Sequence, residues 1–296
     1  MMPVVLFMAA AIAGVALWRD RYLREVRRVA ARRSLGSDGV VVGGAAFRCV
    51  RPDAPAVLLL HGAGDTPQTL QYLAEALFEH GYHVEAPLLP GHGRGMEDFA
   101  RLTADELTDA ANDHYNSLKA AHPWVGVIGL SMGGALAAQL AANDPALPAL
   151  GLVAPYLSMP AGIQRAARLS RIWGTVIPAV LSTDGVSIQD PAEQARSLAY
   201  GVFTPAALRA LYETMQRGAN ALPRIAAPTL MIQSREDNRI TRAAAEAAFA
   251  RIGATEKRLE WTTGAGHIIT VDYGRAHVIA MLLEWMDAHR GATRAG

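Results

Sequence analysis

The chain has 296 residues, of which 51% are hydrophobic and 19% are charged, and its mean hydropathy is +0.13. This composition can bury a substantial core and excludes a disordered chain, and the length fits a single α/β domain. The net charge is only +1, which excludes a typical nucleic-acid-binding domain with a basic surface. The single cysteine, Cys49, excludes an internal disulfide and a zinc site of the CxxC kind.

The N-terminal segment carries no charged side chain from Met1 to Trp18, and the stretch PVVLFMAAAIAGVALW is apolar throughout. Its length is close to the roughly 18 to 20 residues of a membrane-spanning helix. A cleaved signal peptide would carry positive charge before its apolar region. Here the positive charge follows, in seven arginines: Arg19, Arg21, Arg24, Arg27, Arg28, Arg32 and Arg33.

We therefore expect residues 1–33 to form an uncleaved membrane anchor followed by a basic helical linker. By the positive-inside rule, the folded body would face the cytoplasm. The alternative is an apolar leader that lies on the membrane or on the body itself.

Residues 34–296 are expected to form one domain in which short apolar runs alternate with helical patterns. The apolar runs suit buried strands and lie at residues 57–60, 82–86, 125–129, 150–153, 229–233 and 258–261. The helical patterns lie at residues 69–80, 103–121, 131–142, 241–252 and 275–289. This alternation predicts the α/β class, with a mostly parallel sheet covered by helices on both faces. A further strand is expected within residues 40–50, at the sheet edge.

The interval of residues 156–223 interrupts this alternation, because it contains no convincing buried strand. Residues 159–180 are rich in helix formers and arginine, and residues 205–218 also suit a helix. Loops of this length are uncommon unless they have a function. We expect a small helical cap over the carboxyl ends of the strands, where such sheets bind ligands. The alternative is a set of packing helices without a substrate role.

A nucleophile motif lies between a predicted strand and a predicted helix. Gly129-Leu130-Ser131-Met132-Gly133 fits G-x-S-x-G, with the apolar run 125–129 before it and an alanine-rich helix after it. This context predicts a nucleophile elbow, in which glycines permit a sharp turn that exposes the serine oxygen. The start of the following helix also favours negative charge beside Ser131.

A serine nucleophile needs a base within hydrogen-bond reach and a third group that orients the base. His267 follows the last predicted strand on a glycine-rich loop, and Asp237 follows the strand at residues 229–233. The order serine, aspartate, histidine is the one expected for such a sheet. Glu236 and Asp272 are the alternatives for the acid. Asp237 is favoured because its distance in sequence after the strand suits the acid better.

Donors for an oxyanion are also predicted. Met132, directly after the nucleophile, would contribute its backbone N–H, and the Ala63 N–H in the loop after the strand at residues 57–60 is the best candidate for the second donor. His61 is interpreted as a structural loop residue. His92, within Gly91-His92-Gly93, is interpreted as a turn residue that lies behind the site.

Taken together, the motifs HGAGDT, LLPGHGRG, GLSMGG, QSREDNRI and GAGHIITVD resemble the α/β-hydrolase family, and specifically its bacterial carboxylesterase and monoacylglycerol lipase branch. The resemblance runs from Val57 to the C-terminus. It implies a small helical cap, no cofactor, and Ser131, Asp237 and His267 as the triad with oxyanion donors at Ala63 and Met132. The chain departs from the branch in its small Ala63, where a bulky residue is usual, and in its apolar leader. In a bacterium, the anchor would lie in the inner membrane with the catalytic domain in the cytoplasm.

The resemblance implies a serine hydrolase that cleaves short- to medium-chain acyl esters or monoacylglycerols through an acyl-enzyme on Ser131. The same residues could serve a thioesterase, an acyltransferase, an amidase or a cofactor-free haloperoxidase. Haloalkane dehalogenases and epoxide hydrolases have an aspartate where Ser131 stands and are disfavoured. A non-catalytic binding scaffold is disfavoured because all three triad candidates are present. The pattern carries no signal for an oligomeric state.

Overall fold

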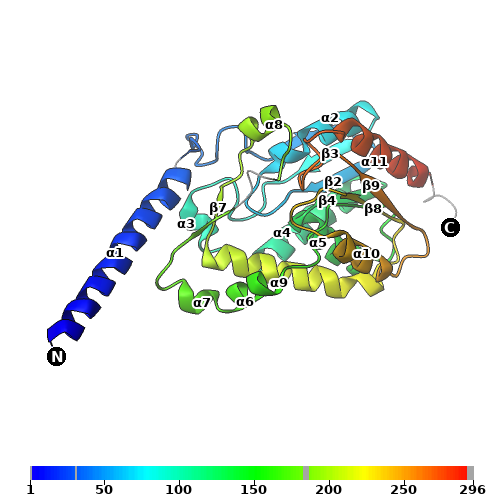
Figure 1. The fold of residues 1–296 in the computed structure, drawn as a ribbon. Coiled ribbons are helices and arrows are strands. Elements are labelled where there is room, and N and C mark those ends of the chain that lie inside the picture. Colours follow the sequence, from blue (N-terminus) through cyan, green and yellow to red (C-terminus); the bar gives the residue numbers. More distant parts are fainter. Residues whose placement is uncertain (1, 31, 183–186, 292–296) are drawn as a thin grey trace.

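A mostly parallel sheet organises the computed structural model, which describes residues 2–30, 32–182 and 187–291 (Figure 1). Within those residues the main sheet has seven strands in the order β1-β3-β2-β4-β5-β8-β9. Their bounds are β1 Phe47–Cys49, β2 Ala56–Leu60, β3 His83–Ala86, β4 Val125–Leu130, β5 Leu150–Val153, β8 Thr229–Ser234 and β9 Lys257–Thr262. β1 pairs antiparallel with β3, and the other neighbours are parallel. The predicted α/β class is confirmed.

Helices cover both faces of this sheet. Strand β2 is buried along its whole length, and its successive side chains point to opposite faces. Leu58 and Leu60 join a core with helices of one face: α4 (Ala104–Ala121), α5 (Met132–Asn143), α9 (Pro205–Ala221) and α10 (Arg242–Ala250). Val57 and Leu59 join the core with helices of the other face: α2 (Gln71–Glu79) and α11 (Arg275–Arg290).

Local capping signals set where several helices begin. Thr103 and Glu106 form a capping box at the start of α4. The Thr204 side chain accepts a hydrogen bond from the Ala207 N–H at the start of α9, where Pro205 follows. Each cap satisfies an N–H group that has no partner inside its helix. The helix starts therefore lie within one or two residues of the predicted ones.

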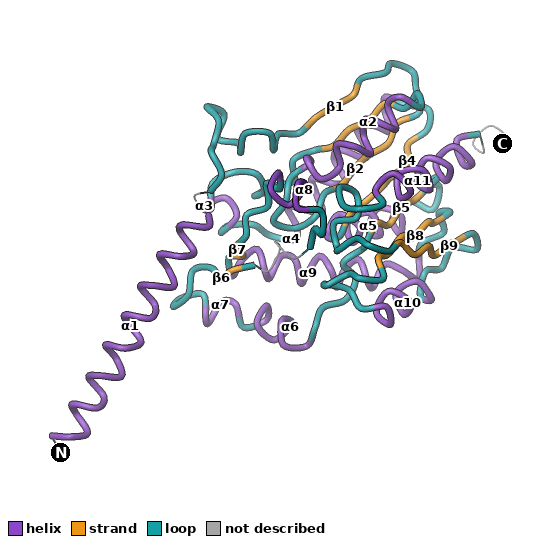
Figure 2. Tube along the Cα trace, turned by 45° about the horizontal axis from the view of Figure 1, so that its top comes forward, coloured by secondary structure: helices purple, strands orange, loops and turns teal. Residues whose placement is uncertain are grey.

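The predicted cap interval contains short helices and, unexpectedly, two short strands. Its elements are α6 (Ala161–Arg168), α7 (Ser170–Trp173), β6 (Val180–Leu181), α8 (Pro191–Arg196), β7 (Val202–Phe203) and α9. β6 and β7 pair antiparallel in a small separate sheet. Figure 2 shows α6 and α7 beside α9, away from the main sheet. The assignment of residues 156–223 as a substrate cap stays a prediction.

The remaining elements are short turns of helix and an edge strand. The helical turns are η1 (Pro67–Leu70), α3 (Met96–Phe99) and η3 (Leu222–Arg224). The edge strand predicted within residues 40–50 forms only at β1, because Gly39 and Gly43 adopt positive φ angles of 72° and 84° in turns that precede it. A single bridge joins Leu35 to Val41 in this region.

The N-terminal apolar and basic segments form one continuous helix, α1 (Met2–Ala30). It projects from the body at its N-terminal end (Figure 1). In its C-terminal half, Arg19 Nε donates to the Val176 carbonyl at 3.0 Å, the Tyr22 hydroxyl accepts from the Leu181 N–H at 3.2 Å, and Val26 is buried in the core.

The prediction of a membrane anchor, and with it an inner-membrane localisation with a cytoplasmic catalytic domain, is wrong. Across residues 2–30, 32–182 and 187–291, no helix has both the length and the apolar character needed to cross a bilayer. The uncharged stretch of α1 ends at Trp18, short of the roughly 20 residues that a spanning helix needs, and the helix continues with arginines, Asp20 and Glu25.

Candidate active site

Ser131 lies in a sharp turn between the central strand β4 and helix α5. Its φ of 54° and ψ of −116° are rare for a residue with a side chain and mark a strained turn. The turn is held in place because the Ser131 N–H donates to the Val153 carbonyl, and the Ser131 carbonyl accepts from the Tyr156 N–H, both at 2.9 Å. The predicted nucleophile elbow therefore has the expected strand, turn and helix.

The glycines of the elbow, residues 129–133, are required by close packing. A Cβ on Gly129 would lie 2.2 Å from the Gly133 carbonyl oxygen, and a Cβ on Gly133 would lie 2.0 Å from the Leu60 carbonyl oxygen. Both distances are far inside van der Waals contact. The G-x-S-x-G pattern thus lets α5 start directly against the ends of β2 and β4.

The structure brings Ser131, His267 and Asp237 together in a hydrogen-bonded chain. His267 Nε2 lies 2.8 Å from Ser131 Oγ, and His267 Nδ1 lies 2.8 Å from Asp237 Oδ2. The side chains of His267 and Asp237 are 5% and 0% exposed. With the Nδ1 proton donated to the carboxylate, the Nε2 lone pair faces the serine hydroxyl, which is the arrangement that a general base requires.

Asp237 is held as a carboxylate by its surroundings. Burial by itself would raise the pKa of this carboxyl group, but the neighbouring His267 and hydrogen bonds to the carboxylate outweigh burial, and the pKa is lowered. Among these bonds, Asp237 Oδ1 accepts from the N–H groups of Arg239 at 2.7 Å and Ile240 at 2.9 Å. Gln233 Nε2 also donates to Oδ2. An ionised Asp237 can orient His267 and stabilise its protonated form.

The alternative acids occupy other places. Glu236 accepts a hydrogen bond from the Gly264 N–H at 3.1 Å, and its side chain is exposed. Asp272 is fully buried and accepts hydrogen bonds from backbone N–H groups instead of from His267. Of the three candidates, Asp237 is the one that hydrogen-bonds to the imidazole of His267.

Both residues predicted to supply oxyanion donors lie next to Ser131. Met132 is the first residue of α5, where backbone N–H groups have no partner inside the helix. Ala63 and Gly62 line the same cavity as Ser131, and a Cβ on Gly62 would lie 3.4 Å from the Ser131 Cβ. The loop after β2 and the start of α5 thus approach the nucleophile from two sides.

Two buried histidines support the loop after β2. His61 Nδ1 hydrogen-bonds to the Gly62 carbonyl at 2.8 Å, and His61 Nε2 accepts from the Leu89 N–H at 3.1 Å. The His92 ring packs edge-on against His61 with centroids 5.2 Å apart. Burial lowers the pKa of His61 to about 3 and that of His92 to about 4. Both low pKa values favour the neutral rings, and the contacts of His61 with the loop backbone agree with its interpretation as a structural loop residue.

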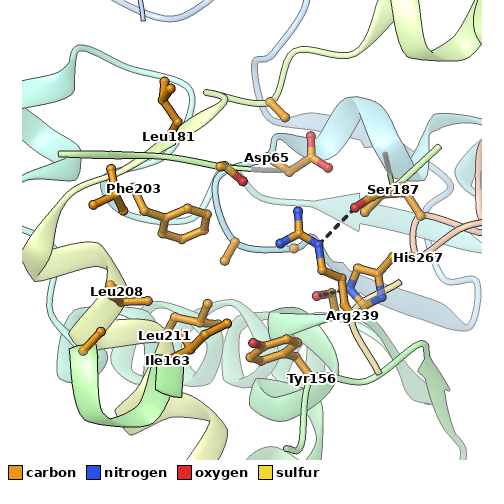
Figure 3. A pocket seen from close by; sticks show the side chains of 18 of the residues that line it. Asp65, Tyr156, Ile163, Leu181, Ser187, Phe203, Leu208, Leu211, Arg239 and His267 are labelled. Carbon is orange, nitrogen blue, oxygen red and sulfur yellow. Dashed lines mark hydrogen bonds between the residues drawn. The ribbon is translucent and has the colours of Figure 1, made fainter. Parts of the chain in front are cut away.

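A cavity of about 540 Å³ opens onto Ser131 and His267, a volume in the range of small-molecule sites. Most of its wall comes from the interval between β5 and β8. Figure 3 shows the apolar side chains of Phe203, Leu208 and Leu211 on the side away from His267. Other apolar residues that line it are Ile163, Ala166, Trp173, Ile177, Val180, Leu181 and Ile188.

Polar side chains line the cavity on the side of His267 (Figure 3). Arg239 Nε donates to Ser187 Oγ at 3.1 Å, and Asp65 also faces this region. Sequence reasoning missed Arg239 and Ser187. Arg239 could have been found from its position two residues after Asp237, whereas Ser187 follows residues with no regular pattern. Within the part of the chain that the structure describes, no group of three or more His, Cys, Asp or Glu side chains is arranged to hold a metal ion.

Comparisons with known proteins identify the family of this chain. Residues 51–273 match the family described as Hydrolase_4, serine aminopeptidase, S33. The chain is 32% identical over 235 residues to a thermostable monoacylglycerol lipase of Bacillus sp. (strain H-257), covering 79% of this chain and 91% of the relative. It is 26% identical over 233 residues to a carboxylesterase of Bacillus subtilis (strain 168), covering 78% of this chain and 92% of the relative.

A solved structure shows the same fold. The structure reported for LipS and LipT, two metagenome-derived lipolytic enzymes, matches with a TM-score of 0.78 at 27% identity, covering 84% of this chain and 100% of that chain. The expected α/β-hydrolase fold and the resemblance to carboxylesterases and monoacylglycerol lipases are confirmed. The chain belongs to the Hydrolase_4 (serine aminopeptidase, S33) family and is an ester hydrolase of the α/β-hydrolase type.

Proposed function

We propose that the protein hydrolyses carboxylic esters with a short- to medium-length apolar acyl chain, including monoacylglycerols, through an acyl-enzyme on Ser131. The observation that carries this proposal is the hydrogen-bonded chain from Ser131 through His267 to Asp237 at the mouth of an apolar cavity. A serine that is aligned with a base and exposed to such a cavity is equipped to attack an acyl carbonyl.

In the first step, Ser131 Oγ attacks the ester carbonyl while His267 Nε2 takes the hydroxyl proton. The negative oxygen of the tetrahedral intermediate would accept hydrogen bonds from the N–H groups of Ala63 and Met132. His267 then gives the proton to the leaving alcohol, and the acyl group stays on Ser131. A water molecule, deprotonated by His267, then attacks the acyl carbonyl. The bond from the acyl carbon to Ser131 Oγ breaks, His267 returns the proton to Oγ, and the carboxylic acid leaves.

The apolar and polar sides of the cavity suit different parts of an ester substrate. The apolar side, with Phe203, Leu208 and Leu211, would hold the acyl chain, because burial of each methylene contributes about 0.8 kcal/mol. The polar side, with Asp65, Ser187 and Arg239 near His267, would face the leaving alcohol. A glycerol leaving group suits such surroundings, and the Bacillus relative is named as a monoacylglycerol lipase.

The test is hydrolysis of p-nitrophenyl esters with acyl chains from C2 to C16, and of 1-monoacylglycerols of the same lengths, by the wild type and by Ser131→Ala. We expect a maximum at short or medium chains and loss of turnover in the variant, since the acyl-enzyme cannot form. Folding of the variant is checked by circular dichroism. A wild type that is folded yet inactive on every ester would overturn the proposal and make thioesters and acyl transfer the next reactions to test.

A further inference from the structure

A buried carboxylate that the proposed mechanism does not use lies close to the catalytic histidine. Asp272 belongs to the histidine loop, residues 263–274, between β9 and α11, and it is 0% exposed. We propose that Asp272 is a positioning residue that holds His267 in place by joining the histidine loop to the return segment, residues 187–190. This inference rests on the proposed function, in which His267 is the base.

Asp272 joins the two segments through four backbone N–H groups. Its Oδ2 accepts from Gly266 at 2.7 Å and from Gln189 at 2.8 Å. Its Oδ1 accepts from Asp190 at 2.8 Å and from Tyr273 at 2.8 Å. Two of these donors belong to the histidine loop and two belong to the return segment. One side chain therefore bridges segments more than eighty residues apart in sequence.

The bridge lies immediately beside the base, because Gly266 precedes His267. On the other side of His267, the Ile268 N–H donates to the Ser187 carbonyl at 3.0 Å. A Cβ on Gly266 would lie 2.5 Å from the same Ser187 oxygen, so the two segments are in close backbone contact. Both neighbours of His267 are thus fixed to the return segment.

The return segment also contacts Arg239, which lies two residues after the acid of the triad. Ser187 Oγ accepts from Arg239 Nε at 3.1 Å, and the Arg239 N–H donates to Asp237 Oδ1 at 2.7 Å. Figure 3 shows Ser187, Arg239 and His267 close together at one side of the cavity, which Ser187 and Ile188 help to line. The loops that carry Asp237 and His267 therefore share one support.

The four donors explain why a carboxylate is needed at this position. A carboxylate has two oxygens that can each accept two hydrogen bonds, whereas an asparagine amide has one oxygen and an NH₂ group that only donates. In Asp272→Asn the NH₂ group would face two N–H groups, and at least two bonds would be lost. The histidine loop and the return segment would then move apart, although the shape of the side chain is conserved.

The first test compares Asp272→Asn with Glu85→Gln, a matched change at another buried carboxylate. Glu85 on β3 binds Arg48 and His114 and lies outside the cavity wall. The concentration of active sites is titrated from the burst of p-nitrophenol, and activity is expressed as kcat per active site. A loss of folded protein then does not change the measured kcat. We expect Asp272→Asn to lower kcat by about 10- to 100-fold, the effect of moving a reacting group by about 1 Å, with a parallel fall in the rate of fluorophosphonate labelling. Glu85→Gln should keep kcat within about twofold.

A second pair of variants keeps the proposal testable if Asp272→Asn does not fold. Asp190 has a φ of −69°, which proline can adopt, so Asp190→Pro removes one N–H donor to Asp272 and Asp190→Ala keeps it. Both variants lose the same side-chain contacts. We expect kcat per site to be at least about threefold lower in Asp190→Pro than in Asp190→Ala.

The positioning role is overturned if Asp272→Asn folds and retains the wild-type kcat per site. If Asp272→Asn does not fold, the role is overturned when the two Asp190 variants have equal kcat. Failure of the proposed function is a different result, because it appears as an inactive wild type.

Discussion

A single methyl group at Gly133 should damage the site while leaving every catalytic side chain in the protein. In Gly133→Ala the new Cβ would lie 2.0 Å from the Leu60 carbonyl oxygen and 2.8 Å from that of His61. Carbon and oxygen need a separation of about 3.5 Å, so the start of α5 must move away from β2 by more than about 1 Å. Such overpacking costs about 1–3 kcal/mol of stability, or more. The shift also displaces Ser131 and the Met132 N–H, and about 1 Å of displacement lowers the rate about 10²-fold.

The assay measures urea unfolding together with kcat per titrated active site on a short-chain p-nitrophenyl ester. The control is Gly95→Ala, because a Cβ there has no neighbour within 4 Å, and it should change neither quantity by more than about 1 kcal/mol or about twofold. If Gly133→Ala retains the wild-type kcat, the reasoning is refuted. That result would mean that the methyl group fits without misaligning Ser131.

Three further predictions concern the triad, the cavity and the buried histidines. Asp237→Asn should lower kcat by about 10⁴-fold with little change in KM, because the amide favours the wrong tautomer of His267; a loss below tenfold in steady-state kinetics would contradict this role. Leu208→Trp should fill the part of the cavity away from His267 and move the optimum of the p-nitrophenyl ester series to shorter chains, and an unchanged profile would show that the acyl chain lies elsewhere. Burial lowers the pKa of His92 to about 4, whereas in the unfolded chain the pKa of this histidine is about 6.5. Between these two pH values the unfolded chain binds a proton that the folded chain does not. The free energy of unfolding therefore falls as the pH decreases. His92→Asn should make this fall shallower by up to about 1.4 kcal/mol per pH unit between pH 6 and pH 4.5, as measured by urea unfolding; an unchanged slope would refute it.

The parts of the fold that hold the site were predictable because their signals are local. β4 and β8 are short apolar runs that are buried on every residue, and a turn with a polar residue follows each. The glycines around Ser131 are required by the elbow itself, so the motif and its context predicted its structure. The positions of Asp237 and His267 could be expected because the carboxyl ends of neighbouring parallel strands meet at one edge.

The features that sequence reasoning missed depend on tertiary contacts. β6 and β7 have two residues each, which is too short for any periodic pattern. The contacts of α1 with the body include those of Arg19, Tyr22 and Val26, and nothing near them in sequence indicates their partners. The sequence places Asp272 only five residues after His267, which makes it an alternative for the acid. Two of its four N–H donors, Gln189 and Asp190, come from a segment that is distant in sequence.

The triad residues follow strands at different places in the sheet, which affects how the active site forms during folding and how it is lost on heating. Ser131 follows the central strand β4, whereas Asp237 and His267 follow β8 and β9 at one edge of the sheet. His267 is separated from Ser131 by 136 residues, and contacts between such distant parts of a chain form late because of the entropy of loop closure. β9 is only partly buried, and weakly buried edges open before the rest of a domain. Recovery of ester turnover during refolding should therefore report the docking of the last strand, and heating should remove turnover before the circular dichroism of the central sheet changes.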